Sequence, residues 1–314
     1  VLMSVRANKH SKSRRVLVPK SVHPHYRAAL KAIVTMQGIE VVEVEFSKQG
    51  GHVELSALKP FEGEDITAIV VPQPNFFGVL EEADALTNWA HANNILVIAC
   101  VNPMALAIFA PPGEWGESGA DIVVGEGQPF GIPLSSGGPY VGFLCCKMEF
   151  VRQMPGRIIG RTVDLEGKPG FALTLQAREQ HIRRAKATSN ICTNQGLAMT
   201  AATIYLALLG AEGLERVALA SHHNIRELAQ ATSKLGNIER VFNRPVFHEK
   251  VLRLAKPVAA VLEHMAKNGV LGGYDLSKDY PELGNALLVC CTETKTPADI
   301  ARYVAALDKA LMEA

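Results

Sequence analysis

The stretch Ile95-Leu-Val-Ile-Ala-Cys-Val101 decides the fold, because an unbroken apolar run is typical of a parallel strand buried on both faces. Comparable runs begin near Val16, Glu40, Ile66 and Asp121, so the five starts are separated by 24, 26, 29 and 26 residues. Apolar residues at helical spacing between them predict helices over 24–37 and 80–93. This regular alternation predicts an α/β fold with a mostly parallel sheet and right-handed crossovers.

The pattern changes after this first half. Pro and Gly are dense over 103–142, a returning strand is predicted over 140–146, and 151–170 is expected to be a basic, Gly-rich connector. A charged helix is predicted over 176–187, and Ser189-Asn190 is expected to cap a long apolar helix through Leu209. From about Gly213 the pattern predicts a smaller α+β domain, with a last strand over 286–291 and a last helix beginning at Thr296-Pro297. The predicted domains are therefore 1–212 and 213–314.

The charge and hydropathy of the chain argue against two classes of partner, nucleic acid and membrane. The 314 residues include 32 Lys and Arg and 31 Asp and Glu, and a formal charge of +1 argues against a broad basic surface for nucleic acid. No apolar run approaches the roughly 20 residues that span a bilayer, so no membrane partner is expected. The opening apolar stub precedes its basic residues, which is the wrong order for a signal peptide. We expect the chain to begin inside a helix, with the N-terminal part of its large domain missing.

Cysteine spacing argues against a metal site and against disulfides. No Cys-x-x-Cys spacing occurs, so no zinc site and no other metal site is expected. Adjacent cysteines on a strand point to opposite faces and pair poorly, which predicts reduced thiols and a cytoplasmic location. The six cysteines are Cys100, Cys145, Cys146, Cys192, Cys290 and Cys291.

Several short motifs carry weaker signals. Gly125-Glu-Gly-Gln-Pro-Phe-Gly131 follows a strand, as a dinucleotide loop does, but its spacing and Pro129 argue against the helix that would hold a pyrophosphate. His23 and His25 flank Pro24 at the carboxyl end of the first strand, where ligands gather in open α/β sheets. They could form a metal pair, or His23 could lie in a capped loop. The basic segment from Arg178 to Lys186 is either a solvated helix face or a surface for an anion or acidic partner.

A longer match identifies a family. Met154-Pro-Gly-Arg157-Ile-Ile-Gly160, followed by Arg178-Glu-Gln-His-Ile-Arg183-Arg-Ala-Lys-Ala-Thr-Ser-Asn190-Ile-Cys-Thr193, resembles the P-protein of the glycine cleavage system, glycine dehydrogenase (decarboxylating). The resemblance covers essentially the whole chain and is closest to the separately encoded α-type chain, subunit 1, of two-subunit enzymes. It implies the fold of type I pyridoxal-phosphate enzymes, with a large domain and a small C-terminal α/β domain. It also implies decarboxylation of glycine and transfer of aminomethyl to the lipoyl H-protein.

The departures from the family pattern decide the expected role. A pyridoxal-phosphate enzyme needs a Schiff-base Lys and usually an Asp beside the pyridine nitrogen. By motif comparison these positions fall near Gln128 and Ala99, in stretches that hold no Lys between Lys59 and Lys147 and no Asp between Asp84 and Asp121. The resemblance therefore implies no catalytic residue here, and a cofactor carried by subunit 2. Residues expected to line the interface or the neighbouring active site are His23, Gly127, Gln128, Arg157, Arg183 and Asn190.

Two other functions stay open on the sequence. The chain could be an autonomous pyridoxal-phosphate enzyme of the aminotransferase class, if a lysine such as Lys147 or Lys186 returned to the site. It could also be a nucleotide-binding scaffold that uses Gly125–Gly131. The first hypothesis, a subunit of a decarboxylating oxidoreductase that is inactive alone, is the one the resemblance favours.

Overall fold

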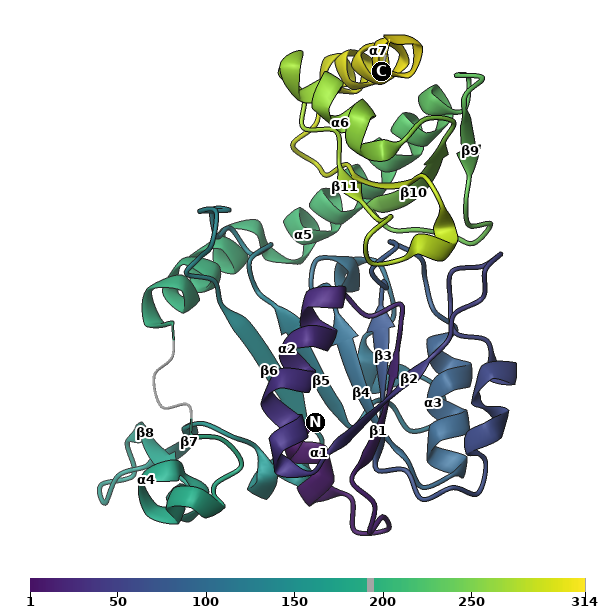
Figure 1. Ribbon diagram of the computed structural model, residues 1–314. Helices are drawn as coiled ribbons and strands as arrows, with labels where there is room; N and C mark the ends of the chain where they lie inside the picture. Colours follow the sequence, from purple (N-terminus) through teal and green to yellow (C-terminus); the bar gives the residue numbers. More distant parts are fainter. Residues whose placement is uncertain (191–194, 314) are drawn as a thin grey trace.

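A computed structural model of the chain describes residues 1–190 and 195–313, so Cys192 and the end of the 178–193 motif lie outside it. Its main body is a six-stranded sheet in the order β2-β1-β3-β4-β5-β6 (Figure 1). All neighbouring strands run parallel except β6, which pairs antiparallel with β5. The strands are β1 (Arg15–Pro19), β2 (Glu40–Val44), β3 (Ala68–Gln73), β4 (Leu96–Val101), β5 (Ile122–Glu126) and β6 (Gly142–Cys146). The predicted α/β class and all five parallel strands are confirmed.

Two cores form on the two faces of this sheet, because alternate residues of a strand point to opposite sides. On one face, Leu17 and Ile69 pack with residues of α3 (Ala83–Ala92) and with a 3₁₀ segment, Leu55–Phe61. On the other, Val16 and Val70 pack with α1 (Leu2–Ala7) and α2 (Pro24–Val34). Since both faces are covered, the parallel strands need apolar side chains at nearly every position, which explains their unbroken apolar runs.

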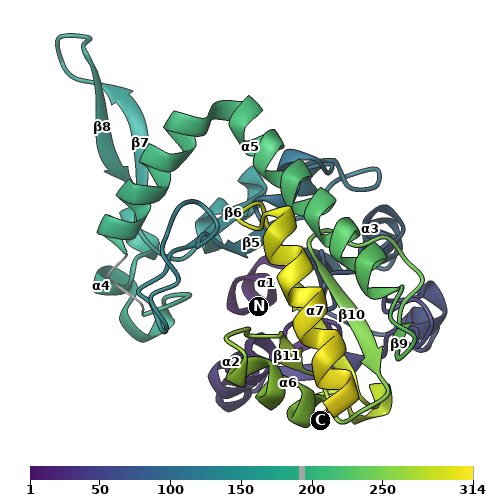
Figure 2. The same ribbon diagram turned by 90° about the horizontal axis from the view of Figure 1, so that it is seen from above.

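The C-terminal part forms a second, antiparallel sheet in the order β11-β12-β10-β9. Helices α6 and α7 and the end of α5 pack on it around a separate apolar core (Figure 2). Its elements are β9 (Ile238–Arg240), β10 (Glu249–Leu254), α6 (Val258–Lys267), β11 (Tyr274–Asp275), β12 (Ala286–Cys290) and α7 (Pro297–Glu313). The predicted last strand and last helix are confirmed, and Thr296 Oγ1 accepts a hydrogen bond from the backbone N–H of Asp299 at 3.2 Å, as a capping residue does.

The long helix α5 (Gly196–Thr232) joins the two sheets and bends at Gly210, whose φ of 60° and ψ of −171° are not helical. Only glycine adopts this backbone region without strain. The domain boundary predicted after residue 212 falls inside this helix, just past the bend. The predicted cap at Ser189-Asn190 is wrong, because the helix begins only at Gly196 with Gln195 before it.

The helix α5 is more apolar on average than its interrupted run of apolar residues indicates. Within the described ranges, this helix is the one that is long and apolar enough to cross a membrane by length and composition, with an 18-residue window of mean hydropathy 1.5. Thr200, Thr203 and Tyr205 interrupt the run of letters but leave the average hydropathy high. Only 11% of that window is buried within this chain, so α5 presents a large apolar surface. The absence of a membrane partner stays a prediction.

The segment between β6 and α5 differs most from expectation. The predicted connector over 151–170 contains a strand, β7 (Ile158–Val163), which pairs with β8 (Pro169–Thr174) in an antiparallel hairpin that projects from the body (Figure 2). The charged helix predicted over 176–187 is wrong as one helix. It reduces to a single turn, α4 (Gln180–Arg183), between two 3₁₀ turns, because Arg184 adopts a φ of 52° that ends the helix.

An aromatic cluster joins the two sheets, and a buried polar network lies beside it in the loops of the first sheet. Glu81 is almost fully buried and accepts hydrogen bonds from Ser21 Oγ at 3.1 Å, Asn75 Nδ2 at 2.7 Å and the backbone N–H of Val53 at 2.7 Å. Burial raises the pKa of Glu81 to about 7 despite these donors. Beside it, four rings from the two halves of the chain pack edge to face or tilted: Phe46, Phe77, Phe242 and Tyr280.

Candidate functional site

A cavity of about 580 Å³ opens where the parallel strands end, beneath the second sheet. The carboxyl ends of β1, β3, β4 and β5 reach it, and Glu249 of β10 lines it from the other side. Parallel sheets place ligand sites at this end, since the loops that leave the strands diverge there. The cavity is therefore the position at which the fold would hold a cofactor or substrate.

His23 lines this cavity. It is the N-cap of α2, and its Nδ1 accepts a hydrogen bond from the backbone N–H of His25 at 3.1 Å. Its ring stacks on Tyr26, with centroids 5.0 Å apart, and packs against Phe76 at 4.5 Å. Burial, and then the nearby His25, lower the pKa of His23 to about 4, so the ring is neutral at physiological pH. Of the two alternatives, the structure shows the capping role.

Gly127 and Gln128 occupy the loop that follows β5. A Cβ on Gly127 would lie 2.8 Å from the carbonyl oxygen of Val141, so this position admits only glycine without a shift of backbone. Gln128 lines the cavity, and its Nε2 donates to the carbonyl oxygen of Ile132 at 2.6 Å. No helix follows directly: the chain turns through a Phe130 N–H bond to the Gly127 carbonyl, which removes the helix N-terminus that a dinucleotide site requires.

The residues of the cavity do not fit covalently bound pyridoxal phosphate. Gln128 lines the cavity with an amide, whereas a Schiff base needs an amine. Ala99 does not line the cavity, because it is fully buried in the middle of β4 and packs in the core on the α3 face of the sheet. Among the residues that line the cavity there is no lysine or arginine to balance a phosphate, and the carboxylates of Glu126 and Glu249 face it instead. The described cavity is therefore acidic and apolar in character.

Neither lysine of the autonomous-enzyme hypothesis reaches the cavity. Lys147 follows β6 at the opposite end of the sheet, where its Nζ lies 2.6 Å from Oδ1 of the buried Asp121. Asp121 also bonds His91 Nε2 at 2.9 Å and the backbone N–H of Val97 at 2.8 Å. Burial works against the charge of Asp121, but these hydrogen bonds outweigh it and hold its pKa below the usual range. Lys186 is exposed on the segment after α4.

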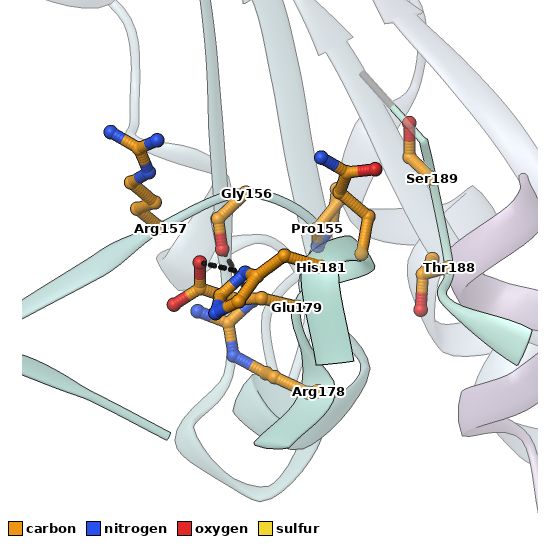
Figure 3. A pocket seen from close by; sticks show the side chains of 9 residues that line it. Pro155, Gly156, Arg157, Arg178, Glu179, His181, Thr188 and Ser189 are labelled. Atoms are coloured by element: carbon orange, nitrogen blue, oxygen red, sulfur yellow. Dashed lines mark hydrogen bonds and ion pairs between the residues drawn. The ribbon is translucent and has the colours of Figure 1, made fainter. Parts of the chain in front are cut away.

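The three remaining predicted residues lie apart from the cavity. Arg157 lines a small pocket of about 80 Å³ beside α4, and Arg183 and Asn190 are exposed on the same segment. Figure 3 shows the guanidinium of Arg157 extending away from the Arg178–Glu179–His181 group. Within that group the buried Glu179 pairs with His181 Nδ1 at 3.5 Å, and Arg178 Nη1 donates to the carbonyl oxygen of Met154 at 2.6 Å. Figure 1 places β7, β8 and α4 beside the lower end of the sheet, far from the second sheet.

Sequence reasoning missed the acidic side of the cavity. Glu126 could have been found, because it ends a predicted strand inside the Gly125–Gly131 motif. Glu249 gave no such signal, since it reaches the cavity only through the packing of the second sheet over the first.

Comparisons with known proteins agree with this architecture. A family model described as the glycine cleavage system P-protein matches residues 1–307. A protein of Thioalkalivibrio sulfidiphilus named "probable glycine dehydrogenase (decarboxylating) subunit 1" is 63% identical over 311 residues, which cover 99% of this chain and 69% of the relative. A relative of the same name in Nitrosospira multiformis is 61% identical over 310 residues, covering 99% and 68%.

Solved structures extend the agreement to the fold. A crystal structure of glycine decarboxylase (P-protein) in inhibitor-bound form is 38% identical, has a TM-score of 0.90, and is matched over 98% of this chain and 68% of its own. A sphingosine-1-phosphate lyase of Burkholderia pseudomallei, at 18% identity and a TM-score of 0.71, over 100% of this chain and 67% of its own, shares the fold alone. The fold is that of type I pyridoxal-phosphate enzymes, as the resemblance implied. This chain belongs to the glycine cleavage system P-protein family.

Proposed function

We propose that this chain is subunit 1 of glycine dehydrogenase (decarboxylating) and that it completes the enzyme without carrying the cofactor. The observation that carries the proposal is the cavity, which lies at the carboxyl ends of the parallel strands and is lined by Gln128 and two carboxylates, with no lysine among its described lining residues. Pyridoxal phosphate, the electron sink for loss of CO2 from glycine, is then bound by subunit 2. The lipoyl H-protein accepts the aminomethyl group, and the assembly is a cytoplasmic heteromer.

Exposed apolar side chains on α5 indicate an interface with a large protein partner. Leu197, Ile204 and Leu208 lie on one face of α5, because residues seven and four positions apart share a helix face, and they are 87%, 55% and 80% exposed. The opposite face, at Ala198 and Ala202, packs on the loop that precedes β6. Subunit 2 is the occupant that we assign to this exposed stripe.

The β7–β8 hairpin continues the same apolar character. Phe171, Val163 and Ile159 are 78%, 60% and 58% exposed, although large apolar side chains are usually buried. Exposed apolar patches are typical of protein–protein interfaces. Together, the stripe on α5 and this hairpin form what we call the assembly surface. Arg157 and Arg183, which lie near the hairpin in the chain and are exposed, are proposed to contribute polar contacts to subunit 2 at its rim.

The experiment compares the chain, subunit 2 and their mixture for exchange of label between bicarbonate and the carboxyl group of glycine. We expect exchange only in the mixture. Borohydride reduction followed by peptide mapping should place the reduced pyridoxyl group on subunit 2 alone. Exchange by this chain at the rate of the complex, or a pyridoxyl-lysine on one of its peptides, would overturn the proposal.

A further inference from the structure

Three side chains of metal-ligating type, His248, Glu249 and Cys290, lie close together, and one of them, Glu249, lines the cavity. Glu249 is the first residue of β10, and it pairs directly with Cys290, the last residue of β12. His248 precedes Glu249, and its carbonyl oxygen accepts a hydrogen bond from the N–H of Cys291 at 3.0 Å. One imidazole nitrogen, one carboxylate oxygen and the Cys290 sulfur all lie within 4.8 Å of one another.

The surroundings of these three groups favour a cation over other ligands. The Nδ1 of His248 is buried and has no hydrogen-bond partner, which is unusual, since nearly all buried polar atoms are paired. Glu249 faces the cavity, where Glu126 is a second carboxylate and no lysine or arginine lines the wall within the described ranges. Histidine nitrogens are common ligands of transition metals.

We propose that His248, Glu249 and Cys290 form a binding site for a divalent transition-metal ion, with Zn²⁺ the best match. The donor set of one nitrogen, one oxygen and one sulfur suits zinc, whereas the thiol disfavours the hard cations Mg²⁺ and Ca²⁺. Three protein ligands leave one tetrahedral position open for water or another ligand.

The required movement is small. Zinc bonds of about 2.0–2.3 Å place tetrahedral ligand atoms roughly 3.3–3.8 Å apart, and the ligand atoms here lie within 4.8 Å of one another, so binding closes their spacing by at most about 1.5 Å. Side-chain rotation supplies this, because β10 and β12 are fixed to each other by their strand pairing. On binding, the Cys290 thiol gives up its proton to solvent and the sulfur binds as a thiolate. The site depends on this chain's own fold and not on subunit 2.

The test uses the complex of this chain with subunit 2, stripped by a chelator and titrated with Zn²⁺ alone, and then with Co²⁺ as a spectroscopic probe. We expect one ion per copy of this chain that is lost in Cys290→Ser, together with a thiolate-to-cobalt absorption band that disappears in the same variant. Glu249→Gln and His248→Ala should each weaken Zn²⁺ binding by about tenfold or more. Matched controls are Cys145→Ser, an exposed thiol on β6, and His223→Ala, an exposed imidazole on α5, which should leave binding unchanged.

Alkylation of the wild-type protein supplies a readout that needs no variant. Zn²⁺ should protect Cys290 from iodoacetamide and leave Cys145 reactive, as measured by peptide mass spectrometry. Zinc binding that is equal in the wild type and in Cys290→Ser, or alkylation of Cys290 that zinc does not slow, would overturn the proposal. Glycine exchange by the complex is a separate measurement, so loss of the metal site would leave the proposed function standing.

Discussion

Phe171 on the β7–β8 hairpin offers the sharpest test of the assembly surface. Its side chain is 78% exposed in this chain. A phenylalanine buries roughly 150–250 Å² when it is fully covered, so a partner could remove about 120–190 Å² from water here. At about 25 cal/mol per Å², the upper bound is about 3–5 kcal/mol. Association realises only part of this, and we expect Phe171→Ala to cost about 2–3 kcal/mol of binding free energy.

That cost corresponds to a dissociation constant about 30- to 150-fold weaker. The assay is sedimentation or biolayer interferometry of the purified chain with subunit 2, with glycine exchange followed over a range of subunit concentrations. Because weakened assembly is overcome by mass action, exchange should recover at high subunit concentration. Thermal unfolding of the isolated variant should match the wild type, since the exposed ring stabilises the isolated chain little.

Leu271 provides the matched control. It is 93% exposed on the second sheet's side of the molecule, between α6 and β11, away from the hairpin. Leu271→Ala should leave the affinity within about twofold of the wild type. Equal affinities for Phe171→Ala and the wild type would refute the assignment of subunit 2 to the hairpin, and an equal loss in Leu271→Ala would show that the effect is not local.

Three further predictions concern stability, each measured by chemical denaturation. Asp121→Asn should lower the unfolding free energy by about 2–4 kcal/mol at neutral pH. Because the pKa of Asp121 is lowered in the folded protein, the difference in unfolding free energy between variant and wild type should shrink as the pH falls below about 4. Gly127→Ala should cost about 1–3 kcal/mol through the clash with Val141, whereas Gly113→Ala, with no atom within 4 Å of its Cβ, should cost little. Burial raises the pKa of Glu81, so the contribution of protonated Glu81 to the unfolding free energy is complete below about pH 4.5 and is lost as the pH rises through about 7. Glu81→Gln should therefore flatten the pH dependence of the unfolding free energy between these two pH values.

The large domain could be predicted because its strands are buried on both faces. Such strands are apolar at nearly every position, as in Ile95–Val101, so they stand out in the sequence. Their regular spacing reflects one crossover connection between each pair of strands. The hairpin was missed because Ile158–Val163 reads as basic and glycine-containing, and its partner strand begins with Pro169-Gly170. Gly167, with a φ of 82° in the turn between them, was the available signal, since hairpin turns favour glycine at positive φ.

The candidate site was likewise predictable only in part. His23 and Gln128 could be placed at the cavity, because each lies in the loop after a parallel strand and the topology of the sheet brings those strand ends together. The link between Glu249 and Cys290 could not, since it depends on the register of two antiparallel strands that a helix and a third strand separate in the chain. Arg157 and Arg183 follow the family resemblance alone, and their role stays a prediction.

The bend at Gly210 has a consequence for how the cell must make this protein. The part of α5 before the bend contacts its own chain through small residues such as Ala198 and Ala202, while its large apolar side chains are exposed. If subunit 2 covers these side chains, as proposed, a copy synthesised without it displays an apolar arm of the kind that chaperones and proteases recognise. Balanced synthesis of the two subunits would then be a requirement of folding quality control as well as of catalysis, and the excess subunit should be short-lived.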